Sequence, residues 1–312
     1  FASDLPQAAG LSSSSALVVA VFLAVDAVRG ISATPEYTAA IRDNADLAGY
    51  LGAVENGMSY RTLAGASGVG TMGGSEDHTA ILCARAGSLM QFSYAPVRYE
   101  NDVRMPAGWT FAVGATGVRA EKAGTDLQHY NNLAAAVRQL VRCWHDTEAG
   151  DEDTLAGVLG SSPDAALRLR EIVRQRAGGE ADGLMARLAQ FIAESEEIVP
   201  AARAALARGD VTAFSTLARR SQHYAEHVLG NQVPETIQLV ASAHELGAAA
   251  ASAFGAGFGG SVWALVREDE AEVFLNAWKV DYHARFAHRQ AESAFFITPA
   301  AAPATRLEEV IA

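Results

Sequence analysis

Four consecutive serines, Ser12 to Ser15, follow a glycine and lead into an apolar run, in the stretch PQAAGLSSSSA at residues 6–16. Gly10 allows the backbone to turn and lets a ligand approach it closely. Serines at the start of a helix place hydroxyl groups beside free backbone N–H donors, where the helix dipole favours an anion. One serine would be enough to cap a helix, so four exceed that structural need. The pattern favours phosphate binding over a plain helix cap. The predicted segment comprises Gly10, Leu11, Ser12, Ser13, Ser14 and Ser15.

A second glycine-rich stretch, FGAGFGGS at residues 254–261, matches the letters of the dinucleotide-binding fingerprint G-x-G-x-x-G. That fingerprint needs a strand before it and a helix after it. The residue pattern instead predicts a helix over 234–250 and a strand over 261–266, so a dinucleotide site is excluded. What remains is either a plain turn or a tight loop whose backbone packs against another segment. The glycines of this predicted loop are Gly255, Gly257, Gly259 and Gly260.

The third stretch, GTMGGSEDH at residues 70–78, brings two carboxylates and a histidine to the start of a predicted helix. Carboxylates and a histidine gathered in this way are residue types that can carry out acid–base chemistry. The alternative is ordinary capping, with Ser75 as the cap and both acids complementing the helix dipole. Taken alone, the pattern favours capping. A helical step also turns Glu76 by roughly 100° from Asp77, so Glu76→Gln is expected to leave any turnover that depends on Asp77 nearly intact.

The elements around these stretches indicate a mixed α/β (α+β) fold with helices in the majority. Thr34 is the expected N-cap of one helix, with Pro35 at its first position. We expect a helix over 15–28 to be buried on most sides. A weak boundary is expected near residues 105–108, dividing the chain into 1–104 and 105–312. Helices are predicted over 15–28, 34–51, from 76, over much of 117–250, and over 269–289; strands over 89–94, 97–103, 109–116, 261–266 and 293–298; and irregular structure over 63–75.

Bulk composition narrows the class of partner. The chain of 312 residues is 50 % hydrophobic and carries a formal net charge of -12, which argues against nucleic acid or an anionic membrane as the main partner. Two cysteines, Cys83 and Cys143, form no C-x-x-C pair, which fits a reducing compartment and no zinc site. We therefore expect a cytoplasmic monomer that acts on small molecules.

Together, the three glycine-rich stretches resemble the motifs of the GHMP kinases, and within them those of galactokinases. Residues 6–16 resemble the second family motif, P-x-x-x-G-L-S-S-S-A, and residues 254–261 resemble the third, T-G-A-G-F-G-G-C. Residues 74–78 lie where galactokinases carry G-I-M-D-Q. The segments TGVR at 116–119 and HYN at 129–131 resemble the S-N-V-K-R and Y-N stretch. The resemblance spans nearly the whole chain and implies a two-lobed fold of mixed and antiparallel sheets packed with helices.

Several residues depart from the galactokinase pattern. His78 replaces Gln, Leu133 stands where Arg is usual, and an insertion separates Glu55 from Asp77. The first family motif, G-R-V-N-L-I-G-E-H-x-D-Y, is not found in this sequence, which starts at Phe1. We expect that motif and the N-terminal strands to precede Phe1. Residues 1–312 alone are then expected to bind nucleotide weakly and to phosphorylate no sugar.

The resemblance implies an ATP-dependent sugar kinase, in the first place a galactokinase, which transfers the γ-phosphate to the anomeric hydroxyl of a monosaccharide with Mg²⁺. It implies that Asp77 is the catalytic residue and that Ser14 aligns with the magnesium-binding serine. The resemblance implies that Glu55 is the acidic ligand of magnesium. The insertion between Glu55 and Asp77 makes its alignment with the family less direct.

The resemblance also implies contacts to the sugar from Gly74, Asp77 and Tyr130. The loop from Gly255 to Gly260 would brace the nucleotide segment. Two alternatives remain: a GHMP kinase for fucose, arabinose or a heptose, and a non-catalytic sensor of sugar and ATP on the same fold. The acid at Asp77 and the intact serine segment favour catalysis over the sensor.

Overall fold

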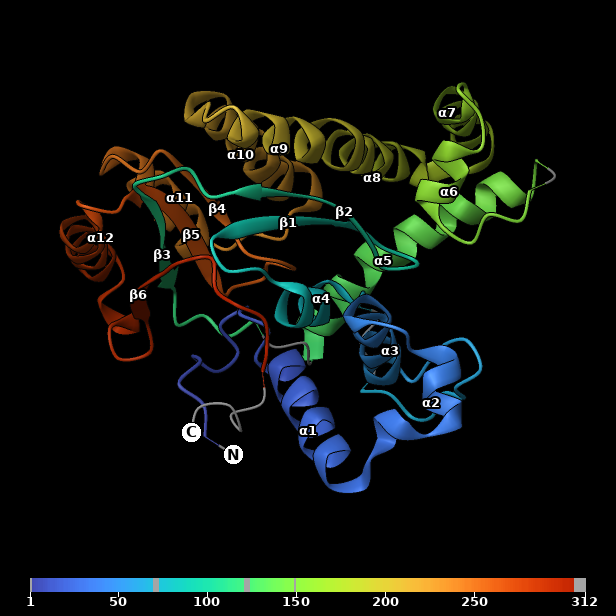
Figure 1. Ribbon diagram of the computed structural model, residues 1–312. Helices are drawn as coiled ribbons and strands as arrows, with labels where there is room; N and C mark the ends of the chain where they lie inside the picture. The colour runs from blue at the N-terminus through green and yellow to red at the C-terminus, as the bar shows by residue number, and fades with distance from the viewer. Residues whose placement is uncertain (1, 70–72, 121–123, 149, 306–312) are drawn as a thin grey trace.

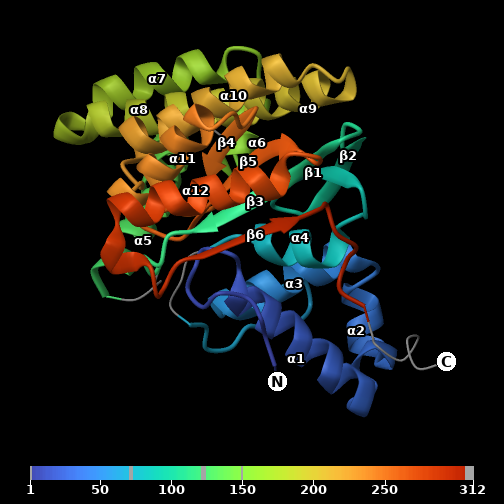
Figure 2. The ribbon, with the colours of Figure 1, turned by 90° about the vertical axis from the view of Figure 1, so that its left-hand side faces the viewer.

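The computed structural model describes residues 2–69, 73–120, 124–148 and 150–305 (Figure 1). The helices of residues 13–83 lie at one end of the molecule and those of residues 155–224 at the other, with the strands between them (Figures 1 and 2). The predicted mixed α/β class, with antiparallel sheets packed against helices, is confirmed.

Four helices form the N-terminal end: α1 (Ser13–Arg29), α2 (Pro35–Ala40), α3 (Asn44–Asn56) and α4 (Glu76–Cys83). Thr34 caps α2 as predicted, since its side chain accepts a hydrogen bond from a backbone N–H of the first turn, and Pro35 opens the helix. The prediction of one continuous helix over 34–51 is wrong. Extended backbone at Ile41 ends α2, and Asp43 then caps α3 through its own side chain.

Helix α1 buries only one face. Val19 packs among residues of α3 and α4 and is 2 % exposed. The expectation that this helix is buried on most sides is wrong, because four apolar side chains spaced three or four residues apart stay exposed in the described structure. These are Leu17, Val21, Val25 and Val28.

The segment after α3 is irregular, as predicted, over 63–69 and 73–75; residues 70–72 lie outside the described structure. Arg61 anchors it, with guanidinium nitrogens 2.6 and 2.8 Å from the two carboxylate oxygens of Asp46 on α3. Asp46 is 4 % exposed. The hydrogen bond from Arg42, supported by Arg61, holds the pKa of the Asp46 carboxyl well below its ordinary range. This cluster fixes the inserted segment to the helix that ends in Glu55 and Asn56.

Two antiparallel sheets follow. Strands β1 (Ser88–Ser93) and β2 (Arg98–Arg104) form a hairpin with a bulge after Gln91. The second sheet has the order β4-β5-β3-β6, from β3 (Trp109–Ala115), β4 (Ala250–Ala253), β5 (Ser261–Arg267) and β6 (Ala294–Thr298). Helices α11 (Pro234–Glu245) and α12 (Ala271–Arg285) pack on it around fully buried Trp278. The expected helix over 234–250 ends five residues early, and only its last expected residue, Ala250, belongs to β4.

A helical layer covers the far end of the molecule. Helices α5 (Gly124–His145), α6 (Leu155–Gly160), α7 (Ala165–Arg176) and α8 (Ala181–Ile192) share one apolar core. Helix α8 continues into a π-helical segment, Ala193–Ile198, and then α9 (Val199–Ala207). Helix α10 (Val211–Tyr224) likewise continues into a π-helical segment, Ala225–Leu229. Among the described residues no helix is long and apolar enough to cross a membrane. The predicted boundary between 104 and 105 falls between β2 and β3 and stays a prediction.

Candidate active site

The serine segment forms the N-terminus of α1 with its hydroxyl groups uncommitted to capping. Gly10 and Ser12 both adopt left-handed backbone, with φ of 68° and 56°. Ser12 is the N-cap, yet within the described chain its side chain makes no capping hydrogen bond. All four serines line one cavity, and the first turn of a helix carries backbone N–H groups that have no partner within the helix. This geometry suits an anion at the helix end.

The glycine-rich loop of residues 254–260 lies directly against that segment. A Cβ added at Gly260, where φ is 87°, would stand 3.0 Å from the carbonyl oxygen of Ala9 and 3.2 Å from Cα of Gly10. The Ser261 hydroxyl donates to the same Ala9 oxygen at 2.6 Å. The loop thus supports the serine segment through close backbone contact. Strand β4 precedes it and β5 follows, so the absence of a following helix still excludes a dinucleotide fingerprint.

Asn231 holds the loop from the other side. Its amide nitrogen donates to the carbonyl of Ala256 at 2.9 Å, and its own carbonyl accepts from the N–H of Phe258 at 2.5 Å. Phe258 adopts left-handed backbone with φ of 59°, which is a strained conformation for a phenylalanine. A Cβ at Gly257 would come 2.1 Å from the Asn231 carbonyl oxygen, so only glycine fits.

Glu55, near the end of α3, meets two polar groups from other elements. Its Oε2 atom lies 3.4 Å from the Ser15 hydroxyl and 3.3 Å from Nε2 of His78. His78 is 1 % exposed. The serine that contacts Glu55 is thus Ser15, whereas Ser14 lines the cavity beside it.

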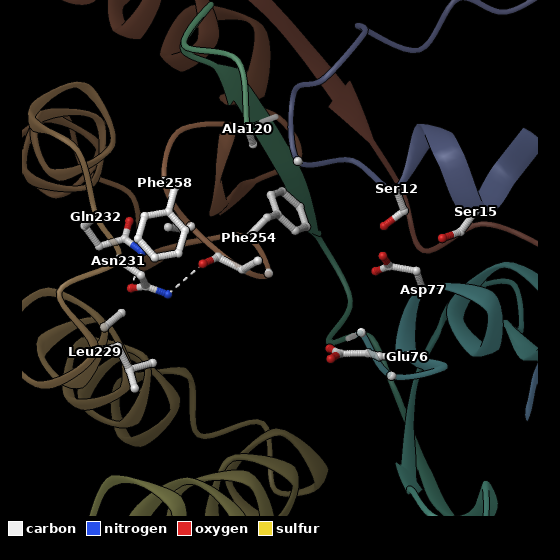
Figure 3. Close-up of a pocket in the computed structure, with 18 of the residues that line it drawn as sticks. Ser12, Ser15, Glu76, Asp77, Ala120, Leu229, Asn231, Gln232, Phe254 and Phe258 are labelled. Atoms are coloured by element: carbon white, nitrogen blue, oxygen red, sulfur yellow. Dashed lines mark hydrogen bonds between the residues drawn. The ribbon is translucent and has the colours of Figure 1, made fainter. Parts of the chain in front are cut away.

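Asp77 and Glu76 open α4 and both line the cavity, as Figure 3 shows. Asp77 lies toward Ser12 and Ser15, and Glu76 lies farther along toward the C-terminal wall (Figure 3). The cavity is wide enough to be lined from both directions of this first turn. That Glu76→Gln leaves turnover nearly intact stays a prediction. Glu76 is an exposed residue as a whole, but the protein atoms around its carboxyl group keep water away from it and raise its pKa, with additional repulsion from Asp77 and Glu194.

One asparagine holds the start of α4 in place. The Asn56 amide nitrogen donates to the carbonyls of Gly52 and Gly73, and its oxygen accepts from the N–H of Gly73 at 3.2 Å. Asn56 thereby ties the end of α3 to the residues just before Asp77. The two carboxylates Glu55 and Asp77, which are 22 positions apart in sequence, are fixed relative to each other by this bridge.

These elements enclose one cavity of about 810 Å³. It brings together most of the residues predicted from the sequence, namely Gly10, Ser12, Ser13, Ser14, Ser15, Glu55, Gly74, Asp77, Gly255 and Gly257. Leu11, Gly259 and Gly260 do not line it, and Gly260 acts from behind through Ala9 and Gly10. The side chain of Tyr130, on α5, lies outside the described structure, so its sugar contact stays a prediction.

The C-terminal helices contribute lining residues that the sequence did not single out. Their polar members are Gln190, Glu194, Ser221, Asn231 and Gln232, and their apolar members include Ala225 and Leu229. The only available signal was the presence of Gln190 and Glu194 among apolar positions of an amphipathic helix. The two π-helical segments at this wall were not foreseeable from residue types, although such segments are frequent at functional sites.

The described lining of the cavity contains four carboxylates and no lysine, arginine or histidine. Oxygen donors from Glu55 and the serine hydroxyls fit Mg²⁺, which prefers hard oxygen ligands and keeps several waters and phosphate oxygens in its shell. The described residues hold no group of three or more histidine, cysteine or acidic side chains suited to a metal. A site with one carboxylate and one hydroxyl agrees with that, because phosphates and water would complete the shell.

Two family models match this chain. The GHMP kinase N-terminal domain matches residues 1–59, and the GHMP kinase C-terminal model matches residues 202–284. The chain belongs to the GHMP kinases. The first match contains the serine segment and Glu55, and the second contains Ser221 and the glycine-rich loop. GHMP kinases are phosphotransferases that use ATP as donor. Residues of both matched segments of this GHMP kinase line the same cavity.

One of the solved structures similar to this chain shares its fold. A crystal structure of Lactococcus lactis galactokinase complexed with galactose aligns with a TM-score of 0.70 at 20% identity, covering 97% of this chain and 69% of that one. Homoserine kinase from Cytophaga hutchinsonii (TM-score 0.44, 14% identity, 96% and 68% coverage) is more distant. So is L. major mevalonate kinase in complex with R-mevalonate (TM-score 0.47, 15%, 93% and 66%). No curated protein sequence matches.

Proposed function

We propose that this GHMP kinase transfers the γ-phosphate of ATP to the anomeric hydroxyl of a monosaccharide, with galactose as the first candidate. The observation that carries the proposal is that the start of α1, Glu55 and Asp77 face one cavity closed by the glycine-rich loop. Phosphoryl transfer needs positioned phosphates, neutralised charge and an oriented nucleophile. Each of these three needs has a candidate group at this cavity.

The phosphates would lie at the N-terminus of α1. Backbone N–H groups there donate to phosphate oxygens, and the dipole favours their negative charge. Ser12, whose hydroxyl caps nothing in the described chain, is free to donate as well. Because the loop of residues 254–260 packs on Ala9 and Gly10, the segment is held in its turn before the nucleotide arrives.

Ser14 and Glu55 are the proposed holders of Mg²⁺, with Ser15 and His78 keeping the Glu55 carboxylate in place. When bound, the ion neutralises phosphate charge that develops during transfer. The described lining offers no cationic side chain for that purpose, which makes the metal and the backbone N–H groups the proposed sources of positive charge.

Asp77 is the proposed base. A carboxylate at the start of a helix, supported by the Asn56 bridge, can orient an acceptor hydroxyl toward the phosphates and take its proton as the new bond forms. The backbone at Gly74 and the side chain of Tyr130 are the proposed neighbours of the sugar. Galactose is proposed first because the motifs resemble those of galactokinases and because the structure with a TM-score of 0.70 is one.

A panel assay tests the proposal. The natural full-length protein would be mixed with ATP, Mg²⁺ and single sugars, and ADP release and sugar 1-phosphate would be measured. We expect transfer to galactose or to a related monosaccharide such as fucose, arabinose or a heptose. Transfer only to homoserine or mevalonate would refute the sugar assignment. Sugar binding without any transfer would refute catalysis in favour of a sensor.

A further inference from the structure

The C-terminal helices form a second wall of the cavity, across from Asp77. Leu229 and Asn231 from this wall face Glu76 and Asp77 across the open space (Figure 3). On the same wall, Gln190 on α8 and Glu194 in the following π-helical segment lie about one helical turn apart. The roles proposed above for phosphates, metal and base use none of the polar side chains of this wall.

Gln190 is 7 % exposed and lines the cavity. An Arg187 guanidinium nitrogen donates to its amide oxygen. A guanidinium has donors only, so the atom that faces Arg187 must be the oxygen, which turns the NH₂ group of Gln190 to the other side. Within the described structure no group accepts a hydrogen bond from that NH₂. A nine-tenths buried donor thus faces the cavity without a protein partner.

Arg187 is suited to this positioning role. Burial lowers the pKa of its guanidinium, and among the described residues no carboxylate pairs with it. Its ring contact is with Phe191, 6.0 Å from the ring centroid. An arginine that pairs with an amide oxygen instead of an acid holds the Gln190 side chain in one orientation.

Glu194 supplies an acceptor beside that donor. The Ser221 hydroxyl donates to its Oε1 atom at 2.9 Å, whereas Oε2 is engaged by no described residue. Burial raises the pKa of the Glu194 carboxyl, and the Ser221 hydrogen bond and Arg220 oppose that rise. Glu194 also repels Glu76. Donor groups placed between these two carboxylates would relieve the repulsion.

We propose that Gln190 and Glu194 bind neighbouring hydroxyl groups of the acceptor, and that this wall selects a neutral polyhydroxylated acceptor over one that carries a carboxylate or a phosphate. The amide NH₂ donates to one hydroxyl oxygen, and Glu194 Oε2 accepts the proton of the next. A charged acceptor would meet Glu76, Asp77 and Glu194 with no cation on the described lining. This inference rests on the proposed function and names Gln190 and Glu194 as the side chains that recognise the acceptor.

The ribose of the nucleotide also carries neighbouring hydroxyls, so the test separates the two ligands. In Glu194→Gln, we expect the KM for galactose, or for the best sugar of the panel, to rise at least about tenfold, because a hydrogen bond to a charged group is lost. The KM for ATP should stay within about twofold. Gln190→Leu keeps the side-chain volume and removes the NH₂ donor. It should likewise raise the KM for the sugar and leave the KM for ATP nearly unchanged. Glu196→Gln, exposed in the same π-helical segment, is the matched control and should change neither KM.

Deoxy analogues of the sugar add a readout that a merely structural role would not move. Wild-type protein should lose affinity for one deoxy analogue by at least about tenfold, and Glu194→Gln should lose nothing further for that analogue. Melting temperatures measured for every variant identify any that fail to fold, and the Gln190 and Glu194 variants serve as independent arms. A rise in the KM for ATP alone, or an unchanged KM for the sugar, overturns the proposal.

Calorimetric binding of the sugar separates this proposal from the function on which it rests. If wild type binds the sugar with a Glu194-dependent affinity and transfers no phosphate, catalysis is refuted and the proposed role of Gln190 and Glu194 in sugar binding is supported. If transfer occurs and Glu194→Gln binds the sugar as wild type does, the sugar-binding role of Glu194 is refuted and the sugar kinase activity is supported. If no monosaccharide binds, both the sugar kinase activity and the sugar-binding role of Gln190 and Glu194 are refuted.

Discussion

Asp77 and Glu76 are neighbouring carboxylates that could both be explained by their place at a helix start, yet their side chains lie in different parts of the cavity. Both lie in the first turn of α4, where an acid complements the helix dipole. Ser75, the N-cap, makes no side-chain capping hydrogen bond in the described structure, so ordinary capping does not account for this turn. Asp77 lies toward the serine segment and Glu76 toward the C-terminal wall (Figure 3).

Asp77→Asn keeps the side-chain shape and removes the base. We expect kcat to fall by about 10²–10⁴, the usual contribution of general base catalysis, with KM values for ATP and sugar little changed. Steady-state kinetics on the natural full-length protein would measure this. Full activity of Asp77→Asn would show that another group orients the acceptor.

Ser14→Ala tests the magnesium assignment. Losing one metal ligand or charge-assisted hydrogen bond should raise the Mg²⁺ concentration needed for half-maximal rate and lower kcat by at least about tenfold. Ser15→Ala is the informative comparison, because the Ser15 hydroxyl is the one that lies 3.4 Å from Glu55. If only Ser15→Ala shifts the Mg²⁺ requirement, the ligand is one residue farther along than the motif resemblance implies.

At the scale of elements, the glycine-rich loop depends on a contact between segments far apart in the chain. Gly257 lies under Asn231, and Gly260 lies against Ala9 and Gly10. The loop therefore joins the residues just before α1, the strand pair β4–β5 and Asn231, which follows the π-helical segment Ala225–Leu229, at one place. Its strained Phe258 is held by a backbone hydrogen bond to Asn231.

Gly257→Ala should damage this junction. Left-handed backbone costs a non-glycine residue about 1–2 kcal/mol, and overpacking against the Asn231 carbonyl adds about 1–3 kcal/mol. We expect a total loss of about 3 kcal/mol in denaturant unfolding, together with a higher KM for ATP. Gly230→Ala is the control, since Gly230 has φ of 58° and nothing within 4 Å of an added Cβ. Equal effects of both substitutions would show that backbone strain alone matters.

Which of these elements could be predicted from the sequence depends on whether the interactions that form them are local. The cap at Thr34 and Pro35 depends on a few adjacent residues and was predictable. Strand β4 was not, because its residues AASA have weak strand preference and pair only through contact with β5. The residue pattern alone gave the glycine-rich loop only an unspecified backbone partner, and the family resemblance supplied the serine segment as that partner. The position of Gln190 among apolar residues of a helix was a weak signal, and its burial and orientation were not predictable because they come from packing and from Arg187.

At the scale of the whole molecule, two opposite sets of carboxyl groups govern how stability varies with pH. Asp46 has a lowered pKa, so its contribution to stability is lost as the pH falls through the acid range. Glu76 and Glu194 have raised pKa values, so the folded protein holds their protons more tightly than the unfolded chain does. Their ionisation opposes folding as the pH rises above the ordinary value of 4.5.

Glu76→Gln removes one of the groups that oppose folding at neutral pH. We expect this variant to melt at a higher temperature than wild type at pH 7 and to show no such advantage at about pH 4, where the wild-type carboxyl is protonated in both states. Thermal melts across this pH range would measure it. An advantage that grows toward acid would contradict the raised pKa of Glu76.

The acidic lining of the cavity also has a kinetic consequence. A polyanionic nucleotide approaching a chain with a net charge of -12, and a described lining without cations, is repelled over a distance set by screening. Added salt should therefore speed the capture of MgATP, the reverse of the usual behaviour at a basic phosphate site. Stopped-flow association of a fluorescent ATP analogue should accelerate between about 10 and 150 mM KCl, as the Debye length shortens from about 30 to 8 Å. Association of an uncharged sugar over the same range should stay constant, and slower nucleotide capture at higher salt would mean that cations outside the described lining dominate the approach.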